Sequence, residues 1–265
     1  MWILYGGVMN TFNKAIPFIY IILALLIMSN GCGGGRAMRV VSQASDGVVS
    51  YDGELCVRTP AGLIIAKSSG DDEIIPIDTI RISGIGKAKL LDYNSRARRI
   101  FFTAGDSLFA YDLTSGLMYN LTKGKFSENI ECGRSSSEGQ FFAFSAAKWN
   151  VGKITFHRLI IVDAVEGGIV HYCDSLISSD VFQWIKPHRL GYVKFIYHRG
   201  ELDTAGMFFD TERNIAISSR DQTTDFLKIP CNTHISPNGE WALEIIAGEP
   251  KLKYLLPEKP QMGNP

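Results

Sequence analysis

Short runs of strand-forming apolar residues, separated by polar turn residues, extend along most of the chain. The clearest case is SLFAYDLTSGLMYNLT, Ser107–Thr122. Phe109 and Tyr111 are aromatic strand formers, Asp112–Gly116 has the composition of a turn, and strand-like residues resume at Leu117. This pattern predicts two β-strands joined by a tight turn.

A second unit recurs about every 40 to 50 residues. It consists of a hydrophobic strand start, a polar turn that often ends in Gly, and an aromatic-rich strand. Its copies are VVSYDGELCV (48–57), LLDYNSRARRIFF (90–102), GRSSSEGQFFAF (133–144), FQWIKPHRLGYV (182–193) and THISPNGEWALEI (233–245). Such a period, with four short strands in each repeat, is typical of β-propeller blades, so the fold class predicted is an all-β propeller.

Two motifs give the repeat a family resemblance. Ile235–Leu243, ISPNGEWAL, resembles the W/I-SPDG-xxIAF motif of TolB-type, or WD-like, β-propeller repeats, and Phe182–Tyr192 is similar with the DG replaced. The companion hairpin of that family, strand-D-x-x-T/S-G-strand-Leu-Thr, resembles Tyr111–Thr122. Its turn returns at Asp163–Gly167 and at Asp210–Asn214, where Asn214 is expected to take the left-handed conformation of a turn Gly.

The resemblance covers roughly residues 45–250 and implies about five four-stranded blades. The first blade spans about residues 40–85, and the fifth is short. Arg39–Gln43 is expected to supply its missing outer strand and so to fasten the two ends of the ring, because an open ring leaves strand edges unpaired. A ring of six with one diverged unit, or an incomplete array, stays open as an alternative.

The N-terminal segment predicts export. Ala15–Met28 is an apolar run preceded by Lys14, too short for a bilayer span and typical of a signal peptide. Gly31-Cys32 then resembles a bacterial lipobox, in which the Cys32 thiol carries the lipid; plain cleavage near Gly31 and an uncleaved anchor are the alternatives. Met1 or Met9 could be the start. The predicted parts are a signal peptide (1–31), a Gly-rich tether (32–38), the propeller domain (39–256) and a Pro-rich tail (257–265).

Composition narrows the classes of function. The chain has 265 residues, 46% of them hydrophobic, and a formal net charge of zero. This hydrophobic content excludes a disordered chain, and the charge balance argues against a nucleic-acid binder, which needs a basic surplus for phosphate contacts.

Four cysteines follow Cys32, and none has the spacing of a zinc site. They allow three disulfide connectivities in an oxidising envelope, and buried thiols are the alternative for Cys56, Cys132, Cys173 and Cys231. Because Cys132 and Cys231 hold similar places in two repeats, we expect them to be parallel features rather than partners.

Candidate chemistry is sparse, and neither a cofactor nor a metal is expected. Some propellers are carbohydrate-active enzymes with acids or a metal in the central funnel, which makes a glycan hydrolase or lyase the alternative function. The residues on or beside predicted innermost strands that could serve it are Asp92, Glu131, Asp180 and His234. Our expectation is instead that such residues line a wet channel, and that Asp112, Asp163 and Asp210 only stabilise turns.

Recognition residues are better candidates than catalytic ones. Trp184 and Trp241 lie inside the repeat and are expected to pack between blades. Two hairpin loops look lengthened, and they carry the candidate contact residues Trp149, Tyr197, His198 and Arg199. The sequence therefore predicts a binding or scaffolding module, lipid-anchored in the bacterial envelope, whose partner is another envelope protein or a glycan and not a nucleic acid.

Overall fold

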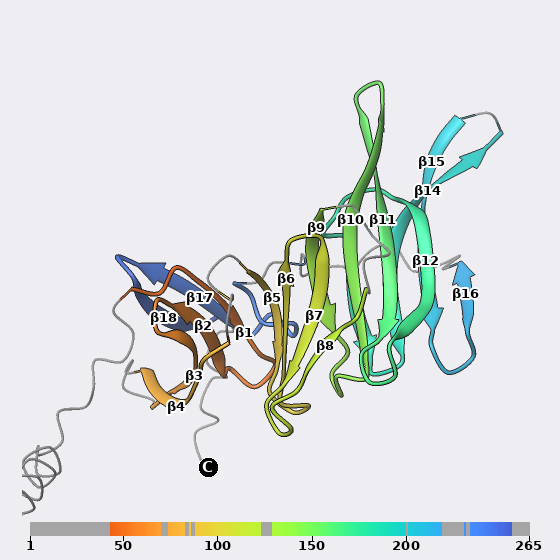
Figure 1. The fold of residues 1–265 in the computed structure, drawn as a ribbon. Helices are drawn as coiled ribbons and strands as arrows, with labels where there is room; N and C mark the ends of the chain where they lie inside the picture. Colours follow the sequence, from red (N-terminus) through yellow and green to blue (C-terminus); the bar gives the residue numbers. More distant parts are fainter. Residues whose placement is uncertain are drawn as a thin grey trace, which may run out of the picture. The chain divides into compact units, whose positions relative to one another are not determined.

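A computed structural model describes residues 43–69, 74–82, 85, 88–122, 129–199, 201–218, 231 and 234–255, without the side chains of 147–149 and 198. The regular elements within these ranges are β-strands (Figure 1). The predictions for the signal peptide, for the lipid-bearing Cys32, for the tether and for the Pro-rich tail lie outside the described residues. In the described part of the chain, no helix is long and apolar enough to cross a membrane.

The first two sheets are four-stranded antiparallel meanders, in which the order of strands in the sheet is their order in the chain. The first contains β1 (Asp46–Val49), β2 (Leu55–Thr59), β3 (Gly62–Ser68) and β4 (Ile74–Ile80). The second contains β5 (Lys89–Asn94), β6 (Arg99–Ala104), β7 (Ser107–Asp112) and β8 (Met118–Asn120). The predicted hairpin at Ser107–Thr122 is therefore β7 and β8.

Two further meanders follow, joined by a single pairing of Leu176 with Lys194. The third contains β9 (Ile130–Ser135), β10 (Phe141–Val151), β11 (Ile154–Asp163) and β12 (Gly168–Leu176). The fourth contains β13 (Phe182–Lys186), β14 (Arg189–His198), β15 (Glu201–Asp210) and β16 (Ile215–Ser218). A fifth unit has β17 (Trp241–Ile246) and β18 (Glu249–Tyr254), with Ile235 bridged to Ala242 where an inner strand would run.

The first strands of the four complete sheets pack against one another: β1 contacts β5, β5 contacts β9, and β9 contacts β13. In the fifth unit, β17 contacts β1. Sheets arranged in this way are blades, and the predicted β-propeller fold class is confirmed. The described residues form four complete blades and a partial fifth, at the period that the repeats predict.

Apolar side chains fill the space between neighbouring blades. Phe101 of β6 stacks on Phe142 of β10 with ring centroids 4.3 Å apart, and both rings are buried. Gly133 of β9 permits this packing, because a Cβ there would lie 2.5 Å from the Phe142 ring. Burying an aromatic side chain contributes roughly 1.5–3 kcal/mol, so these layers hold adjacent blades together.

In the first, third and fifth units, the turn before the second strand is closed by a serine side chain. The hydroxyl oxygen of Ser50 accepts a hydrogen bond from the Glu54 amide at 3.0 Å, and that of Ser236 accepts one from the Trp241 amide at 2.9 Å. Ser136 acts in the same way on the Phe141 amide at 3.2 Å. This shared device explains why the Ser-x-x-Gly pattern recurs in the sequence.

The three aspartate turns behave as predicted. A carboxylate oxygen of Asp112 accepts hydrogen bonds from the amides two and three residues later, at 3.0 and 2.9 Å. Asp163 and Asp210 repeat this geometry at 2.8–3.1 Å. The last turn residue is left-handed in each case, and Asn214, with φ of 53°, takes the place of the Gly. These carboxylates are structural.

The first and last described segments meet in the fifth unit. The amides of Gln43 and Ala44 donate to the Gly248 carbonyl oxygen at 3.0 and 2.9 Å. Asn238 also donates from its side chain to the Tyr51 carbonyl oxygen at 3.0 Å. The predicted closing strand at Arg39–Gln43 lies outside the described residues except for Gln43, whose bond to Gly248 ties the start of the domain to its end.

Candidate functional site

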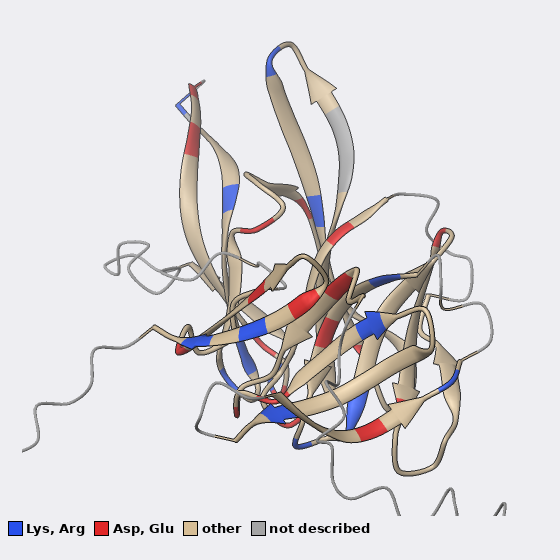
Figure 2. Cartoon of the chain, turned by 90° about the vertical axis from the view of Figure 1, so that its left-hand side faces the viewer, with Lys and Arg blue, Asp and Glu red and all other residues tan. Residues whose placement is uncertain are grey.

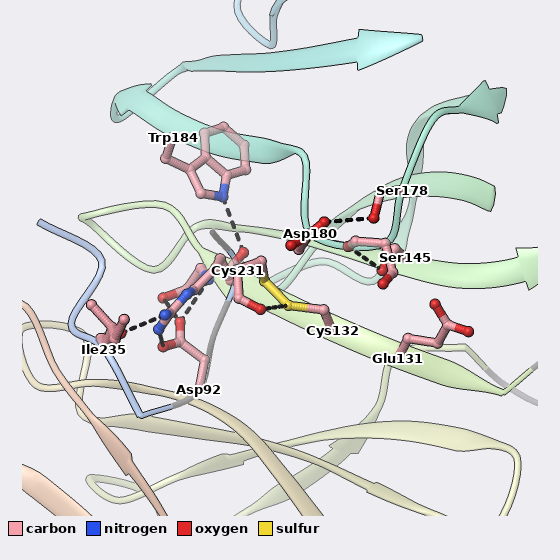
Figure 3. The surroundings of a disulfide bond; sticks show 12 residues. Asp92, Glu131, Cys132, Ser145, Ser178, Asp180, Trp184, Cys231 and Ile235 are labelled. Atoms are coloured by element: carbon pink, nitrogen blue, oxygen red, sulfur yellow. Dashed lines mark hydrogen bonds and ion pairs between the residues drawn. A yellow bond between two sulfur atoms is a disulfide. The ribbon is translucent and has the colours of Figure 1, made fainter. Parts of the chain in front are cut away.

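A buried ion pair lies where the inner strands meet. Arg134 of β9 is 5% exposed, and its Nη1 lies 3.5 Å from Oδ1 of the fully buried Asp92 on β5. Arg134 Nη2 donates to the Ile235 carbonyl oxygen (Figure 3). The amide and hydroxyl of Ser135 donate to Asp92 Oδ2 at 2.7 and 2.6 Å. We call Asp92, Arg134, Ser135, Trp184 and Ile235 the axial cluster.

Each member of the axial cluster has defined partners. Burial raises the pKa of the Asp92 carboxyl, while the Arg134 charge and the hydrogen bonds from Ser135 act in the opposite direction. Trp184 of β13 donates from its indole Nε1 to the Arg134 carbonyl oxygen at 3.0 Å, and its ring stacks on Phe141. Blades two to five are therefore joined at this point through polar contacts.

A small cavity adjoins the axial cluster in the described part of the chain. The adjoining cavity has a volume of about 10 Å³, the room of a single water molecule. Burial, and then the nearby Asp92 charge, raise the pKa of the Tyr51 hydroxyl on its wall. The cavity is lined by Tyr51, Arg134, Phe182, Gln183, Trp184, Cys231 and Pro237. As formed by the described residues, this cavity is too small for a sugar ring.

A disulfide joins Cys132 to Cys231, close to the axial cluster (Figure 3). The two Cα atoms lie 6.2 Å apart, although 99 residues separate the cysteines in the sequence. The expectation that they are parallel features rather than partners is therefore wrong. Equivalent positions on inner strands converge in a propeller, so similar places in two repeats can face each other. Cys56 and Cys173 are buried free thiols, and burial raises the pKa of Cys56.

The predicted funnel residues do not converge on a common point. Glu131 Oε2 lies 3.1 Å from Nδ1 of His157, and Asp180 accepts a hydrogen bond from the Ser178 hydroxyl at 2.6 Å. Figure 3 shows the carboxylates of Asp92, Glu131 and Asp180 pointing in different directions, and His234 is exposed beside Ile235. The expected wet channel is not found at Asp92, whose carboxylate is fully buried. Among the described residues, no group of three or more His, Cys, Asp or Glu side chains could hold a metal ion.

The sequence prediction missed Arg134. A signal was present, because Asp92 lies two residues before the turn residue Asn94, and Arg134 lies two residues before the equivalent Ser136. Opposite charges at one position of successive inner strands indicate a pair across neighbouring blades.

The predicted contact loops are extended strands. Trp149 lies in β10, and Tyr197 and His198 lie in β14, while only Arg199 is in a turn. The strands β10, β11, β14 and β15 form two long hairpins that extend past the other strands (Figure 1). Tyr197 is 79% exposed. The lengthened segments thus continue the ladder of their own hairpin instead of forming irregular loops.

An open groove of about 490 Å³ lies at the turns of the second and third blades. Arg99 in its wall is held by Asp112 at 3.3 Å and by the Gly139 carbonyl oxygen at 3.1 Å, while Glu138 and Glu166 are exposed. The lining residues are Ala97, Arg99, Glu138, Gln140, Asp163, Val165 and Glu166. The groove is wide open to solvent, and polar and apolar side chains both line it.

Comparison with known proteins gives similarity of structure alone. No family model matches the chain, and no curated protein does. Similar solved structures include the tricorn protease, with 13% identity over 69% of this chain and 18% of that one (TM-score 0.45). Dipeptidyl peptidase 4 of Porphyromonas gingivalis is 12% identical over 71% of this chain and 34% of its own length, with a TM-score of 0.45. Oligogalacturonate lyase from Vibrio parahaemolyticus is 9% identical over 82% of this chain and 91% of its own length, with a TM-score of 0.39.

The chain thus spans well under half the length of the first two of these proteins. At such identities and TM-scores, the likeness says nothing about activity.

Proposed function

We propose that this protein is an exported, lipid-anchored, TolB-like β-propeller that acts as a binding or scaffolding module in the bacterial envelope. The observation that carries the proposal is the closed axial cluster. Where a funnel enzyme would need convergent acids beside open space, Arg134 and Asp92 fill the centre, and the cavity next to them has room for one water molecule. Function then depends on the outer surfaces.

Two features support the proposed location. The apolar run Ala15–Met28, followed by Gly31-Cys32, has the form of a lipoprotein signal. The disulfide between Cys132 and Cys231 is of a kind that persists in oxidising compartments and is rare in the cytosol. Both agree with a domain that is tethered outside the cytoplasmic membrane.

The partner in this proposal is another envelope protein or a glycan. The groove at Glu138 and Glu166 offers it exposed carboxylates, and a rigid ring of blades presents them without ordering a loop. The test is affinity purification of the tethered protein from envelope membranes, with mass spectrometry of what it retains. A partner retained by the wild type and lost from the Glu138→Lys, Glu166→Lys double variant is expected. The same charge change at Glu201 and Asp203, on a distant hairpin, is the matched control.

The alternative, a glycan hydrolase or lyase, makes a different prediction. Replacing Glu131 by Gln or Asp180 by Asn would then abolish turnover of an envelope glycan while the domain stays folded. A binding module keeps its partner in both variants, so partner retention together with a glycan-cleavage assay separates the two functions.

The anchor is tested by growing cells with radioactive palmitate. Label on the wild-type chain and none on Cys32→Ser is expected. An unlabelled wild type, or label that survives in Cys32→Ser, would overturn the lipid anchor and leave the binding role to be judged on its own experiment.

A further inference from the structure

The antiparallel meander sorts the turns onto two opposite rims of the domain. Because the inner strands of a propeller run in the same direction, we place the turns from the second to the third strand of the blades on one rim, which we call the hairpin rim. Turns from the first to the second strand, and from the third to the fourth, lie on the other, which we call the turn rim. The β10–β11 and β14–β15 turns are on the hairpin rim, as is the β17–β18 turn at Gly248.

The hairpin rim is dominated by the two long hairpins, which lie side by side at their middle. Phe156 of β11 and Phe195 of β14 have ring centroids 5.2 Å apart. Beyond this contact, apolar and aromatic side chains are exposed on both hairpins. They are Val151 (59%), Ile154 (36%), Tyr197 (79%) and Leu202 (36%). What sets these four side chains apart from other exposed apolar residues is their place near the ends of the two hairpins that protrude furthest (Figure 1).

The chain enters the domain on this same rim. Gln43 and Ala44 are hydrogen-bonded to Gly248, which belongs to the β17–β18 turn. Cys32 lies eleven residues before Gln43 in the sequence. A fully extended tether of that length reaches about 36–40 Å. β10 has 11 residues where β6 has 6, so the long hairpins extend about 17 Å further than their counterpart in the second blade. The tether is long enough for the lipid and the tips to meet one bilayer.

We infer that the hairpin rim faces the lipid bilayer and that the tips of the β10–β11 and β14–β15 hairpins insert into its interface. This inference rests on the proposed lipid anchor. Tyr, Val, Ile and Leu at protruding tips fit the boundary between headgroups and acyl chains. The turn rim, with its open groove, then points away from the membrane and is accessible to the partner.

Charge makes only a small contribution to this contact. Lys153 and Arg199 are exposed at the tips and attract anionic headgroups, but Glu201 and Asp203 on the second hairpin oppose them. Figure 2 shows that charged residues occupy only short bands of the two hairpins. Binding is therefore carried by apolar insertion and depends weakly on salt and on the anionic lipid content.

The test is flotation of the full chain carrying Cys32→Ser, which lacks the lipid, with vesicles of phosphatidylcholine alone or with one quarter phosphatidylglycerol. Replacing Val151, Ile154, Tyr197 and Leu202 by Asp is expected to lower the vesicle partition coefficient by about tenfold or more, since the burial of even one such side chain corresponds to about that factor. The matched control replaces Leu117 (54% exposed) and Val165 (56%), on the turn rim, by Asp and leaves binding unchanged.

A second measurement does not depend on loss of binding. A solvent-sensitive dye on Val151→Cys is expected to shift its emission to the blue when vesicles are added, whereas the same dye on Val165→Cys does not. Equal flotation of the tip variant and its parent, an equal loss in the turn-rim control, or an unshifted dye at position 151 would falsify the inference. Loss of a protein partner without loss of vesicle binding would also overturn it.

These outcomes are separable from failure of the anchor. Palmitate labelling judges Cys32 alone, whereas the flotation uses a chain in which Cys32 is already replaced.

Discussion

The axial cluster and the two long hairpins are opposite in character. At the axis, residue types that suggest chemistry are buried and bound to one another, as in the ion pair of Arg134 with Asp92. On the two long hairpins, side chains near the tips are exposed, with Tyr197 79% accessible. The difference between the two regions lies in whether each side chain has its partners within the domain. The polar centre stabilises the fold, and the apolar tips are available for binding.

The largest effect is expected from breaking the axial ion pair. Arg134→Met leaves the Asp92 carboxylate buried without its cation, which costs about 3–5 kcal/mol. The free energy of unfolding from urea titration measures this loss. Adding Asp92→Asn to Arg134→Met should restore part of it, because the unpaired charge is gone. A cost below about 1 kcal/mol for Arg134→Met would show that the axis is not the stabilising region.

Removal of the disulfide is expected to come next. Cys132→Ser together with Cys231→Ser opens a loop that spans 99 residues of sequence, and such losses are typically about 2–4 kcal/mol. Thermal unfolding with and without a reductant checks this. The wild type should lose stability on reduction, and the double variant should not respond. Equal responses would mean that the bond contributes nothing.

A pair of glycine substitutions compares the two regions at matched backbone conformation. Gly139, at an inner turn, and Gly152, at the tip of the β10–β11 hairpin, have φ of 70° and 62°. A Cβ at Gly139 would lie 2.3 Å from the Ala97 Cβ, whereas one at Gly152 meets nothing within 4 Å. Gly139→Ala should cost about 2–4 kcal/mol, the sum of strain and overpacking, and Gly152→Ala about 1 kcal/mol. Similar unfolding midpoints for the two variants would contradict this.

The smallest effect concerns the pH dependence of stability. Partial burial acts to raise the pKa of Asp112, but hydrogen bonds from Ser115, Thr114 and Arg99 outweigh it and hold that pKa below its ordinary value. A carboxyl with a lowered pKa contributes stability above its unfolded pKa, and this contribution is lost as the pH falls through the folded value. The melting temperature of the wild type should therefore fall further between pH 5 and pH 2 than that of Asp112→Asn. Parallel curves would show that Asp112 does not contribute in this way.

Much of the fold could be predicted because each blade is encoded locally. Turn residues such as Ser136 and Asp163 close hydrogen bonds within a few residues, so their spacing alone indicates the strands on either side. The disulfide could not be found in this way. Whether Cys132 meets Cys231 depends on how the inner strands converge, and no local pattern records that convergence.

The ion pair of Asp92 with Arg134 lies between these two cases, because the sequence predicts one partner and not the other. The sequence of one repeat indicates Asp92 as a polar residue on an inner strand but not its partner, because Arg134 belongs to the next repeat. Aligning the repeats on Asn94 and Ser136 places Asp92 and Arg134 at the same position, which is enough to suggest a pair. The long hairpins are hard to predict for another reason. Polar residues such as Lys153 and Arg199 are typical of loops, but the strands continue to the tips because β10 pairs with β11 and β14 pairs with β15.

The hydrogen bonds from Gln43 and Ala44 to Gly248 have a consequence for the order of assembly. The segment at Gln43 and Ala44, just before β1, cannot reach this neighbour until more than 200 residues have followed it from the ribosome. Contacts between such distant segments slow folding, because a long loop must close before they form. The early blades can therefore form first, and the domain is completed only when its last unit arrives.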